Sequence, residues 1–456
     1  MLNLDLATIA GTTNGRLLGA NVSIQTVSTD SRKQAEQSLF VALRGERHDA
    51  HDFVAASAAL GAVAALVDHE IAVDLPQVIV ADTQVALGQI ARHVRGQREI
   101  CVIGITGSNG KTTVKTLLAG ILSRYAPTHF SVGSFNNEIG LPLTLLAMPE
   151  GTRFAVLEMG AGKPGDIAYL VNIAKPEVAL VNNIAPAHLE RMGSLDGIAE
   201  TKGALYSGLP ENGIAVINAD ESYADYFTEL AGGRNVIRFG LGDGADVSAR
   251  FADGDSCSDF TLVTPVGEVH IGIPLLGLHN VLNALAAAAL ALAVKVPLQT
   301  IKAGLEAASA VPGRAARRDH DSGAMVIDDT YNANPASFAA AIETLSLRQG
   351  TRILVMGDMR ELGANAEKLH AEIGELAKQK GIDHLYAVGD LSHAAVAKFG
   401  AGARHFADQP ALVCAVLAEL KPSVTAWVKG SRGSAMDRVV NALFTSSPNA
   451  GGRHAA

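Results

Sequence analysis

The strongest local signal in the sequence is GITGSNGKTT, residues 104–113. It follows an apolar run at residues 100–105 and precedes a helical pattern from Lys111, the setting of a phosphate-binding loop. Its glycines let backbone N–H groups wrap phosphate oxygens, Lys111 brings positive charge to the terminal phosphates, and Thr112 can ligate magnesium. The generic motif has four residues between its first glycine and the Gly-Lys pair, whereas this loop has five. The pattern therefore predicts a variant phosphate-binding loop.

Short apolar runs alternate with helical patterns on the C-terminal side of this loop. They lie at residues 100–105, 155–157, 178–181 and 214–217, and beyond Pro312-Gly313 at 324–327, 352–356, 385–388 and 425–428. Alternation of this kind favours mostly parallel sheets covered by helices. We therefore predict an α/β fold with two successive doubly wound domains.

A smaller α/β domain is expected before the loop. Apolar runs at residues 39–43 and 62–67 flank an alanine-rich helical pattern that starts at Phe53, and polar residues at 95–98 separate this segment from the next. A chain of 456 residues also exceeds what one hydrophobic core usually supports. We predict three domains, at residues 1–97, 98–312 and 313–456.

Composition limits the partners and the compartment. The formal charge of -9 gives no basic surface for a nucleic-acid backbone, so we expect no such partner. The three cysteines form no CxxC pair, which favours a reducing, cytoplasmic compartment. The start MLNLDLATIA lacks the basic residues of a signal peptide, and the longest apolar stretch, residues 284–294, is too short for a membrane span. We expect a cytoplasmic monomer without a membrane anchor.

Three polar side chains follow apolar strands or lie on the next helix. Glu158 ends the strand of FAVLEMG, where parallel sheets present acidic residues to ligands, so we interpret it as a magnesium ligand. His188 in NNIAPAHLE and Lys202 in ETKGALY are weaker signals. Alone, such a histidine is more often a structural hydrogen-bonding residue and such a lysine a solvated surface charge.

Further polar residues lie before and after the proposed domain junction. Asn280 and Asn283 in GLHNVLNALAA are one helical turn apart and could face one ligand edge, although Asn280 could instead cap the helix. Arg314 in PGR is suited to a phosphate that bridges two domains. The adjacent acids Asp328 and Asp329 open DDTYNANPAS and suggest a nucleotide or metal site.

Taken in order, these motifs resemble those of the Mur ligases, a family of ATP-dependent amide synthetases. The resemblance covers nearly the whole chain and is carried by GSNGKTT, LEMG, AHLE, HNVLNALAA, PGR and DDTYNANP. It implies a UDP-muramoyl-peptide-binding N-terminal domain, a central phosphate-loop ATPase domain, and a C-terminal Rossmann-like domain that closes on the amino-acid substrate and ATP.

Other motifs indicate which branch of the family the chain resembles. VSTDSR at residues 27–32 and LFVALRGERHDAHDF at residues 39–53 are similar to ligases that act on longer muramoyl peptides. MGDMRELG and VKGSRGSAMDRVV, at residues 356–363 and 428–440, look like those of the branch that adds D-alanyl-D-alanine, and no DNPR motif of the diaminopimelate-adding branch occurs. One departure is Arg191 in AHLERMGS, where the family commonly has glycine.

The resemblance also implies a role for each matching residue. Thr112 and Glu158 would hold one magnesium ion, and His188 with Lys202, carbamylated by carbon dioxide, would serve a second. The catalytic set would be Lys111, Glu158, His188, Lys202 and Asp329. ATP would be held by Gly107, Ser108, Asn109, Gly110, Lys111, Thr112, Thr113, Asn280, Asn283, Arg314 and Asp329. The UDP-linked substrate would contact Ser31, Arg32, Asn136, Asn137 and Glu138.

The activity implied is the ATP-dependent joining of D-alanyl-D-alanine to a UDP-N-acetylmuramoyl-tripeptide through an acyl phosphate, in peptidoglycan precursor synthesis. A diaminopimelate- or lysine-adding ligase and a folylpolyglutamate-type ligase are alternatives within the same chemistry. A nucleotide-dependent switch protein is an alternative of another class. The sequence leaves open whether the third peptide residue is diaminopimelate or lysine.

Overall fold

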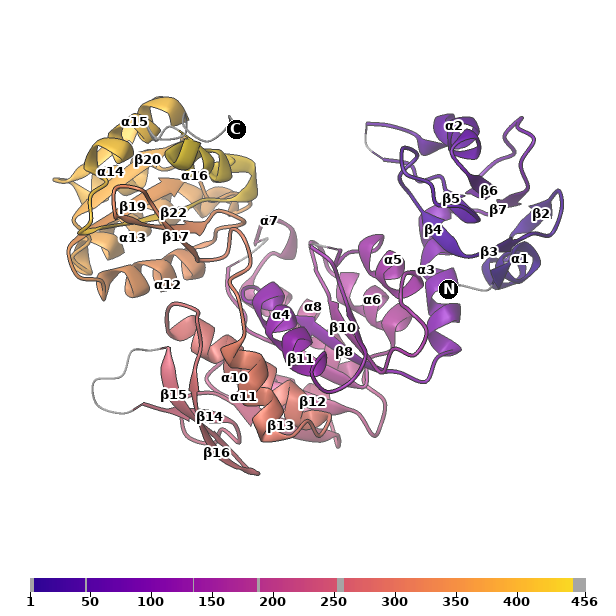
Figure 1. Cartoon of the computed structure of the whole chain (residues 1–456), viewed down its shortest axis with the longest axis horizontal. Helices are drawn as coiled ribbons and strands as arrows, with labels where there is room; N and C mark the ends of the chain where they lie inside the picture. Colours follow the sequence, from indigo (N-terminus) through magenta and orange to yellow (C-terminus); the bar gives the residue numbers. More distant parts are fainter. Residues whose placement is uncertain (1–3, 46, 134, 187–188, 252–257, 446–456) are drawn as a thin grey trace, which may run out of the picture.

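Three α/β domains follow one another along the chain (Figure 1). A computed structural model describes residues 4–45, 47–133, 135–186, 189–251 and 258–445. The first domain lies at one end of the molecule, the central domain in the middle, and the third beside the central domain at the other end. The predicted α/β class and three-domain architecture are confirmed.

The N-terminal domain is built on a five-stranded sheet in the order β2-β7-β6-β5-β4, with only the β2–β7 pair antiparallel. The strands are β2 (Arg16–Leu18), β4 (Thr26–Ser28), β5 (Ser38–Val41), β6 (Ala62–Val67) and β7 (Gln77–Ile79), with β1 (Leu4–Asp5) and β3 (Ser23–Ile24) paired apart from them. Its helices are α1 (Leu6–Thr13), η1 (Ala50–Phe53), α2 (Val54–Ala59) and α3 (Thr83–Gly96).

The central domain has a six-stranded, wholly parallel sheet in the order β13-β12-β11-β8-β10-β9. The strands are β8 (Cys101–Thr106), β9 (Thr128–Phe130), β10 (Phe154–Glu158), β11 (Val178–Val181), β12 (Ile214–Asn218) and β13 (Asn235–Phe239). The helices are α4 (Lys111–Leu122), α5 (Gly140–Leu146), α6 (Asp166–Ala174), α7 (Leu189–Met192), α8 (Leu195–Ser207), α9 (Ala224–Ala231), α10 (Leu278–Ala293) and α11 (Leu298–Glu306).

The alanine-rich helix α10 explains how this domain closes over the phosphate loop. Its small side chains are buried against α4 and the sheet, so the helix backbone can approach closely. A second core on the opposite face of the sheet continues into the N-terminal domain. The polar residues at the start of α10 are thereby fixed beside the loop.

A small antiparallel sheet interrupts the central domain. It consists of β14 (Ser248–Arg250), β15 (Asp259–Thr264) and β16 (Gly267–Gly272), and lies on the far side of α10 and α11 from the N-terminal domain (Figure 1). The sequence analysis did not predict this sheet. Alternate residues of β15 are buried, which is the period of a half-buried strand.

The C-terminal domain has a six-stranded sheet in the order β17-β18-β22-β19-β20-β21, parallel except for β17. The strands are β17 (Ala316–Asp319), β18 (Met325–Asp329), β19 (Thr351–Gly357), β20 (His384–Val388), β21 (Ala403–Phe406) and β22 (Val424–Lys429). Helices α12 (Pro335–Ser346), η2 (Gly363–Asn365), α13 (Ala366–Gln379), α14 (His393–Phe399), α15 (Gln409–Glu419), η3 (Arg432–Ser434) and α16 (Met436–Thr445) complete it.

Most predicted strands coincide with observed ones. The runs at residues 62–67 and 178–181 match β6 and β11 residue for residue, and the others differ by one or two positions at their ends. The domain boundaries at 97/98 and 312/313 remain predictions. No helix in the described part of the chain is long and apolar enough to cross a membrane.

Candidate active site

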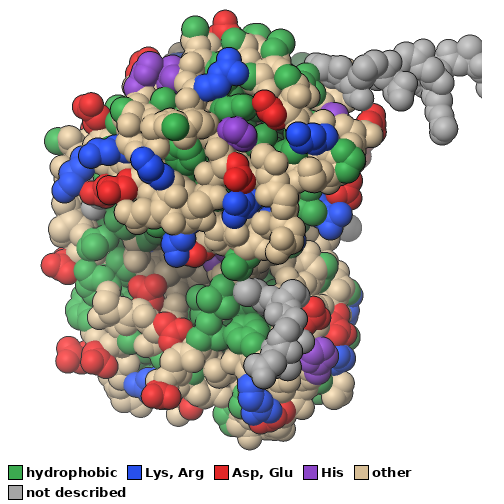
Figure 2. Space-filling model, turned by 90° about the vertical axis from the view of Figure 1, so that its left-hand side faces the viewer, with side chains coloured by type: hydrophobic (Ala, Val, Ile, Leu, Met, Phe, Trp, Pro, Cys, Tyr) green, Lys and Arg blue, Asp and Glu red, His purple; other side chains and the backbone are tan. Residues whose placement is uncertain are grey.

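A cleft of about 880 Å³ lies between the central and C-terminal domains. Figure 2 shows the molecule from the side of these two domains, with its surface hollowed between them and charged side chains of both signs scattered over it. The cleft is lined by the carboxyl ends of the central strands and by the start of α10. It is completed by the hinge at residues 313–315 and the near edge of the C-terminal sheet.

The phosphate loop joins β8 to α4 at the floor of this cleft. Gly110 caps α4 with a φ of 80°, a left-handed conformation that favours glycine, and a β-carbon there would collide with the side chains of Asn182 and Asn283. Lys111 is the first residue of α4, and its Nζ donates to the carbonyl oxygen of Gly107 at 2.8 Å. The loop therefore has the tight backbone and local positive charge that a polyphosphate requires.

Thr112 and Glu158 meet, as the sequence analysis required for a shared metal ion. Thr112 Oγ1 donates to Glu158 Oε2 at 2.8 Å, and Asn136 Nδ2 donates to Glu158 Oε1 at 2.8 Å. Lys115, one helical turn after Lys111, lies 3.2 Å from Glu158 Oε2, and both side chains of this pair are buried. A hydroxyl and a carboxylate side by side are the oxygen ligands that magnesium prefers.

Electrostatics keep this carboxylate ionised. Burial alone would raise the pKa of Glu158, but the charges of Lys111 and Lys115 and the hydrogen bonds from Asn136 and Thr112 outweigh it and lower the pKa. Burial lowers the pKa of both lysines, and Glu158 partly offsets this effect. The site therefore places an ionised carboxylate in a cationic surrounding suited to phosphate.

A network of asparagines holds the loop against the neighbouring strand and α10. The backbone N–H of Asn109 donates to Asn183 Oδ1 at 2.7 Å, and Asn182 Nδ2 donates to the carbonyl of Asn109 at 3.0 Å. Asn182 Nδ2 also donates to Asn283 Oδ1 at 3.1 Å, and Asn283 Nδ2 to Asn280 Oδ1 at 3.2 Å. The network fixes both predicted α10 asparagines at the cleft.

The capping interpretation of Asn280 is wrong. Helix α10 begins after Gly277, which makes no side-chain cap, and Asn280 Nδ2 instead donates to the carbonyl of Leu276 at 2.8 Å. Asn280 is inside the helix because Gly277, with a φ of 88°, takes the position of the cap.

The C-terminal domain supplies the opposite wall. The guanidinium of Arg314 lies 4.1 Å from the ring centre of Tyr331, and both residues line the cleft. Asp329 Oδ2 accepts from Lys429 Nζ at 2.7 Å and from the Trp427 indole at 3.2 Å. Asp329 thus lies at the cleft as an ion-paired acid. Its neighbour Asp328 is not among the cleft-lining residues and accepts from Thr330 Oγ1 at 2.6 Å.

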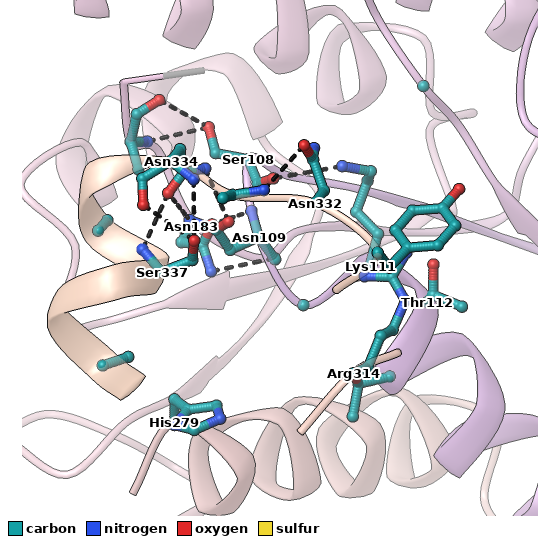
Figure 3. A pocket seen from close by; sticks show the side chains of 18 of the residues that line it. Ser108, Asn109, Lys111, Thr112, Asn183, His279, Arg314, Asn332, Asn334 and Ser337 are labelled. Atoms are coloured by element: carbon teal, nitrogen blue, oxygen red, sulfur yellow. Dashed lines mark hydrogen bonds between the residues drawn. The ribbon is translucent and has the colours of Figure 1, made fainter. Parts of the chain in front are cut away.

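A side-chain hydrogen bond links the two walls. Asn334 Nδ2 donates to Asn109 Oδ1 at 2.9 Å, and the reverse hydrogen bond measures 3.4 Å. Figure 3 shows Asn334, Asn109 and Asn183 on one side of the pocket, with Lys111, Thr112 and Arg314 on the other and His279 below them. The phosphate loop and the C-terminal domain are thereby joined.

The residues proposed for a second metal ion are only partly described. His188 lies outside the described residues. Lys202 lies on α8 with 3% of its surface exposed, and is therefore not a solvated surface lysine. Burial, and then the charge of Lys111, hold the pKa of Lys202 well below its ordinary value. Lys202 is not among the residues that line the cleft.

The proposed UDP-substrate residues fall into two groups. Asn136, Asn137 and Glu138 line the cleft just before α5. Ser31 and Arg32 do not line it, but follow β4, which contacts α5. Arg32 is 83% exposed and pairs with Asp30, and this hydrogen bond lowers the pKa of Asp30 to about 2.

Several residues in the cleft or next to it were not predicted. Lys115 could have been found from its position one turn after Lys111 on the same face of α4. Asn182 and Asn183 directly follow β11, at the carboxyl edge where ligands bind. His279, Tyr331, Asn334 and Lys429 lie inside motifs that were recognised as wholes.

The fold and this cleft define a three-domain nucleotide-binding protein with a phosphate loop. Family models match in the same order: "Mur ligase family, catalytic domain" at residues 23–95, "Mur ligase middle domain" at 105–291, and "Mur ligase, glutamate ligase domain" at 313–432. The chain therefore belongs to the Mur ligase family, and the predicted resemblance is confirmed.

Named relatives match over almost the whole length. The UDP-N-acetylmuramoyl-tripeptide–D-alanyl-D-alanine ligase of Escherichia coli K12 is 46% identical over 97% of this chain and 99% of that protein. The crystal structure of MurF from Acinetobacter baumannii superposes with a TM-score of 0.92 at 35% identity, covering 98% of this chain and 99% of that one. MurF from Thermotoga maritima in complex with ADP matches with a TM-score of 0.82 at 28% identity, covering 92% and 97%.

Proposed function

We propose that the chain joins D-alanyl-D-alanine to a UDP-N-acetylmuramoyl-tripeptide at the expense of ATP, with release of ADP and phosphate. The cleft carries the proposal, because it unites the phosphate loop and Glu158 with Lys429 and Asp329 of the C-terminal domain. The names of the E. coli and A. baumannii relatives support the choice of substrates. The chain is accordingly a ligase of peptidoglycan precursor synthesis.

The first step brings two anions together. The tripeptide carboxylate attacks the γ-phosphorus of ATP, the bond to ADP breaks, and an acyl phosphate forms. Lys111 at the loop and Arg314 at the hinge are the cations that offset the negative charge of the transferring phosphoryl group. Asn280 and Asn283 orient the nucleotide from the start of α10.

The second step makes the amide. The dipeptide amine attacks the acyl carbon, a proton leaves the nitrogen, and the carbon–oxygen bond to phosphate breaks. The C-terminal domain excludes water from the acyl phosphate, which hydrolysis would destroy. Lys429, with 3% of its side chain exposed and paired with Asp329, belongs to the wall that covers the site.

Magnesium fits the donors that are present. Thr112 and Glu158 supply a hydroxyl and an ionised carboxylate, and bound magnesium would neutralise charge on the phosphate oxygens. We propose a second ion held through His188 and Lys202. The lowered pKa of Lys202 favours its neutral amine, the form that reacts with carbon dioxide to give a carbamate that binds metal.

Each domain binds a different substrate in this proposal. Residues 1–97 bind the UDP end of the muramoyl peptide through Ser31 and Arg32, residues 98–312 bind ATP, and residues 313–456 bind D-alanyl-D-alanine. Asn136, Asn137 and Glu138 contact the peptide at the cleft. We further propose that the enzyme acts as a monomer in the cytoplasm, where ATP is supplied.

A substrate comparison tests the function. Phosphate release and amide product are measured with ATP, magnesium and D-alanyl-D-alanine plus UDP-N-acetylmuramoyl-tripeptide, and in parallel with a folate and glutamate. We expect stoichiometric phosphate and amide only with the muramoyl peptide. Product with the folate would favour a folylpolyglutamate-type ligase. Nucleotide binding without any amide in single-turnover assays would favour a switch protein.

A further inference from the structure

Two cations on the cleft wall take no part in holding ATP in the proposal above. Lys163 lies in the loop between β10 and α6, Arg191 lies on α7, and both are exposed residues that line the cleft. A β-carbon added at Gly162 would lie 3.9 Å from Arg191 Nη1 and 3.9 Å from Asp166 Oδ2. The guanidinium therefore lies against the loop that carries Lys163.

Three of the carboxylates that line the cleft are already engaged. Glu158 pairs with Lys115, and Asp329 pairs with Lys429. Asp166 Oδ2 accepts from the backbone N–H groups of Gly162 at 2.8 Å and Lys163 at 3.0 Å. Within the described part of the chain, neither Lys163 nor Arg191 forms an ion pair. Both side chains are available to an anion that enters the cleft.

The loop beside Arg191 is connected to Glu158 through Asn136. Glu158, which bonds to Thr112, also accepts from Asn136, and the backbone of Asn136 accepts from the Gly160 N–H at 2.7 Å. Gly162 is two residues further along, which the chain spans in at most about 7 Å. Arg191 Nη1 lies beside Gly162 and is therefore next to a residue at most about 7 Å along the chain from Gly160, the partner of Asn136.

A diaminopimelate residue is long enough to span a distance of about 7 Å. Its two carboxyl carbons are six bonds apart, as many as two backbone residues contain, so they extend to about the same 7 Å. A relative from A. baumannii is described as the ligase of UDP-N-acetylmuramoylalanyl-D-glutamyl-2,6-diaminopimelate. When one carboxylate of the third residue reacts, the other can meet a cation at the position of Arg191.

We propose that Arg191, assisted by Lys163, binds the distal carboxylate of a diaminopimelate residue and so selects this tripeptide over the lysine tripeptide. The inference rests on the proposed function. The distal carbon of diaminopimelate carries a carboxylate beside its ammonium, whereas lysine ends in an ammonium alone. A guanidinium attracts the carboxylate in a charge-assisted hydrogen bond and repels the isolated ammonium. Arg191 is thus a specificity-determining residue.

The test compares kcat/KM for the two tripeptides in the full-length enzyme. We expect the wild type to prefer the diaminopimelate peptide, and Arg191→Gln to lower kcat/KM for that peptide roughly tenfold, mainly through KM, with little change for the lysine peptide. Arg191→Lys, which keeps the charge, should retain part of the preference. Arg124→Gln, at an exposed arginine two residues after the end of α4, is the matched control.

Two results would overturn the inference. An equal loss of kcat/KM for both peptides would mean that Arg191 binds a group they share, such as the free carboxylate of the D-glutamyl residue. An unchanged preference in Arg191→Gln would mean that the arginine does not touch the peptide. If the wild type ligates neither peptide, the proposed function itself is wrong, and the three outcomes are therefore distinguishable.

Discussion

At the scale of single residues, the site combines the half-buried Lys111 and the buried Lys115 with one carboxylate, and a third lysine, Lys202, is buried near Lys111. Glu158 lowers the cost of burying Lys111 and Lys115, and Lys202 is buried nearby with its pKa lowered by burial and by the charge of Lys111. Removing a buried cation lowers the free energy of unfolding by more than the energy of the cation's own contacts. The partner carboxylate then stays buried without the charge that compensated its desolvation. The charges are therefore interdependent, and each lysine has a distinct expected phenotype.

Lys111→Ala should abolish ligation without unfolding the enzyme. The backbone of the loop is held by Asn182 and Asn183 and should persist, but the charge on the terminal phosphates is lost. We expect kcat to fall by about a thousandfold or more, as for loss of a group that stabilises a transition-state charge. Phosphate release and thermal unfolding measure the two effects. Lys368→Ala, at an exposed lysine of α13, is the control and should match the wild type in both measurements. Normal turnover in Lys111→Ala would contradict the assignment of Lys111 to the terminal phosphates.

Lys202→Ala tests the carbamate. If the modified lysine holds a metal ion, the variant should be nearly inactive, and acetate or formate should restore part of the rate by occupying the vacated space. Activity is measured with and without the carboxylic acid, and mass spectrometry or carbon-13 NMR with labelled bicarbonate detects the modification directly. Near-normal activity would remove Lys202 from the site. Inactivity without rescue or label would leave an essential lysine that is not carbamylated.

At the scale of elements, the sequence predicts buried parallel strands well and polar networks poorly. Residues 178–181 form a short continuous apolar run bounded by polar residues, so β11 is visible from local sequence. The two asparagines after it matter only because β11 lies beside β8, and that strand order is a tertiary fact. Local sequence favours a surface position for Lys202, because its burial depends on how α8 packs against α6 and α9.

The antiparallel insertion shows a different limit. Strands β14 and β16 are partly exposed and β15 alternates buried with half-buried residues, so none of the three forms the continuous apolar run that marks the parallel strands. Their pairing depends on contacts with α10 and α11 that are remote in sequence. Local pattern therefore identified the sheets that carry the site and overlooked the one that does not.

One prediction concerns the end of β6, where a hydrogen-bonded acid joins three segments of the N-terminal domain. Asp68 accepts from Arg44 Nε at 2.6 Å and Nη2 at 3.0 Å, and lies 3.3 Å from His51 Nε2. The hydrogen bonds from Arg44 outweigh burial and hold the pKa of Asp68 well below 3.8. A lowered acid pKa stabilises the fold above pH 3.8, and this contribution is lost as pH falls through the folded pKa.

Asp68→Asn should therefore lower the melting temperature at pH 7 by roughly 2 °C, and the difference from wild type should shrink below about pH 4. Differential scanning calorimetry between pH 3 and 7 measures this. Asp319→Asn, in an exposed pair with Arg317, is the control and should leave the melting temperature unchanged. A difference that grows as the pH falls would show that Asp68 acts through something other than its charge.

At the scale of the whole molecule, the two terminal domains are attached differently. Helix α3 runs from the N-terminal domain onto the central one, where the buried Arg95 donates to the carbonyl of Ala174 at 3.0 Å and to Glu177 at 2.6 Å. The core of the N-terminal domain is also continuous with that of the central domain. The C-terminal domain is reached through the hinge at residues 313–315 and contacts the phosphate loop through Asn334. Movement between domains is therefore expected at the C-terminal junction.

The last prediction separates the two roles of Asn334. Its side-chain oxygen caps α12 by accepting from the Ser337 N–H at 2.9 Å, while its amide reaches Asn109 of the phosphate loop. Serine is an equally good N-cap but is too short to cross the cleft, whereas alanine loses both interactions. Asn334→Ser should therefore keep the stability of the C-terminal domain and loosen its position, and Asn334→Ala should also lose about 1 kcal/mol of stability.

Single-molecule energy transfer between dyes on α4 and α13 reports the position of the domain, and thermal unfolding reports the cap. For Asn334→Ser we expect a broader distance distribution in the absence of nucleotide and an unchanged melting temperature. ATP should narrow the distribution in the wild type and in both variants if it bridges the loop and Arg314, because the nucleotide would replace the lost contact. Unaltered distributions in both variants would mean that the hinge alone sets the domain angle, since the amide pair would then contribute nothing to holding the cleft at its observed width.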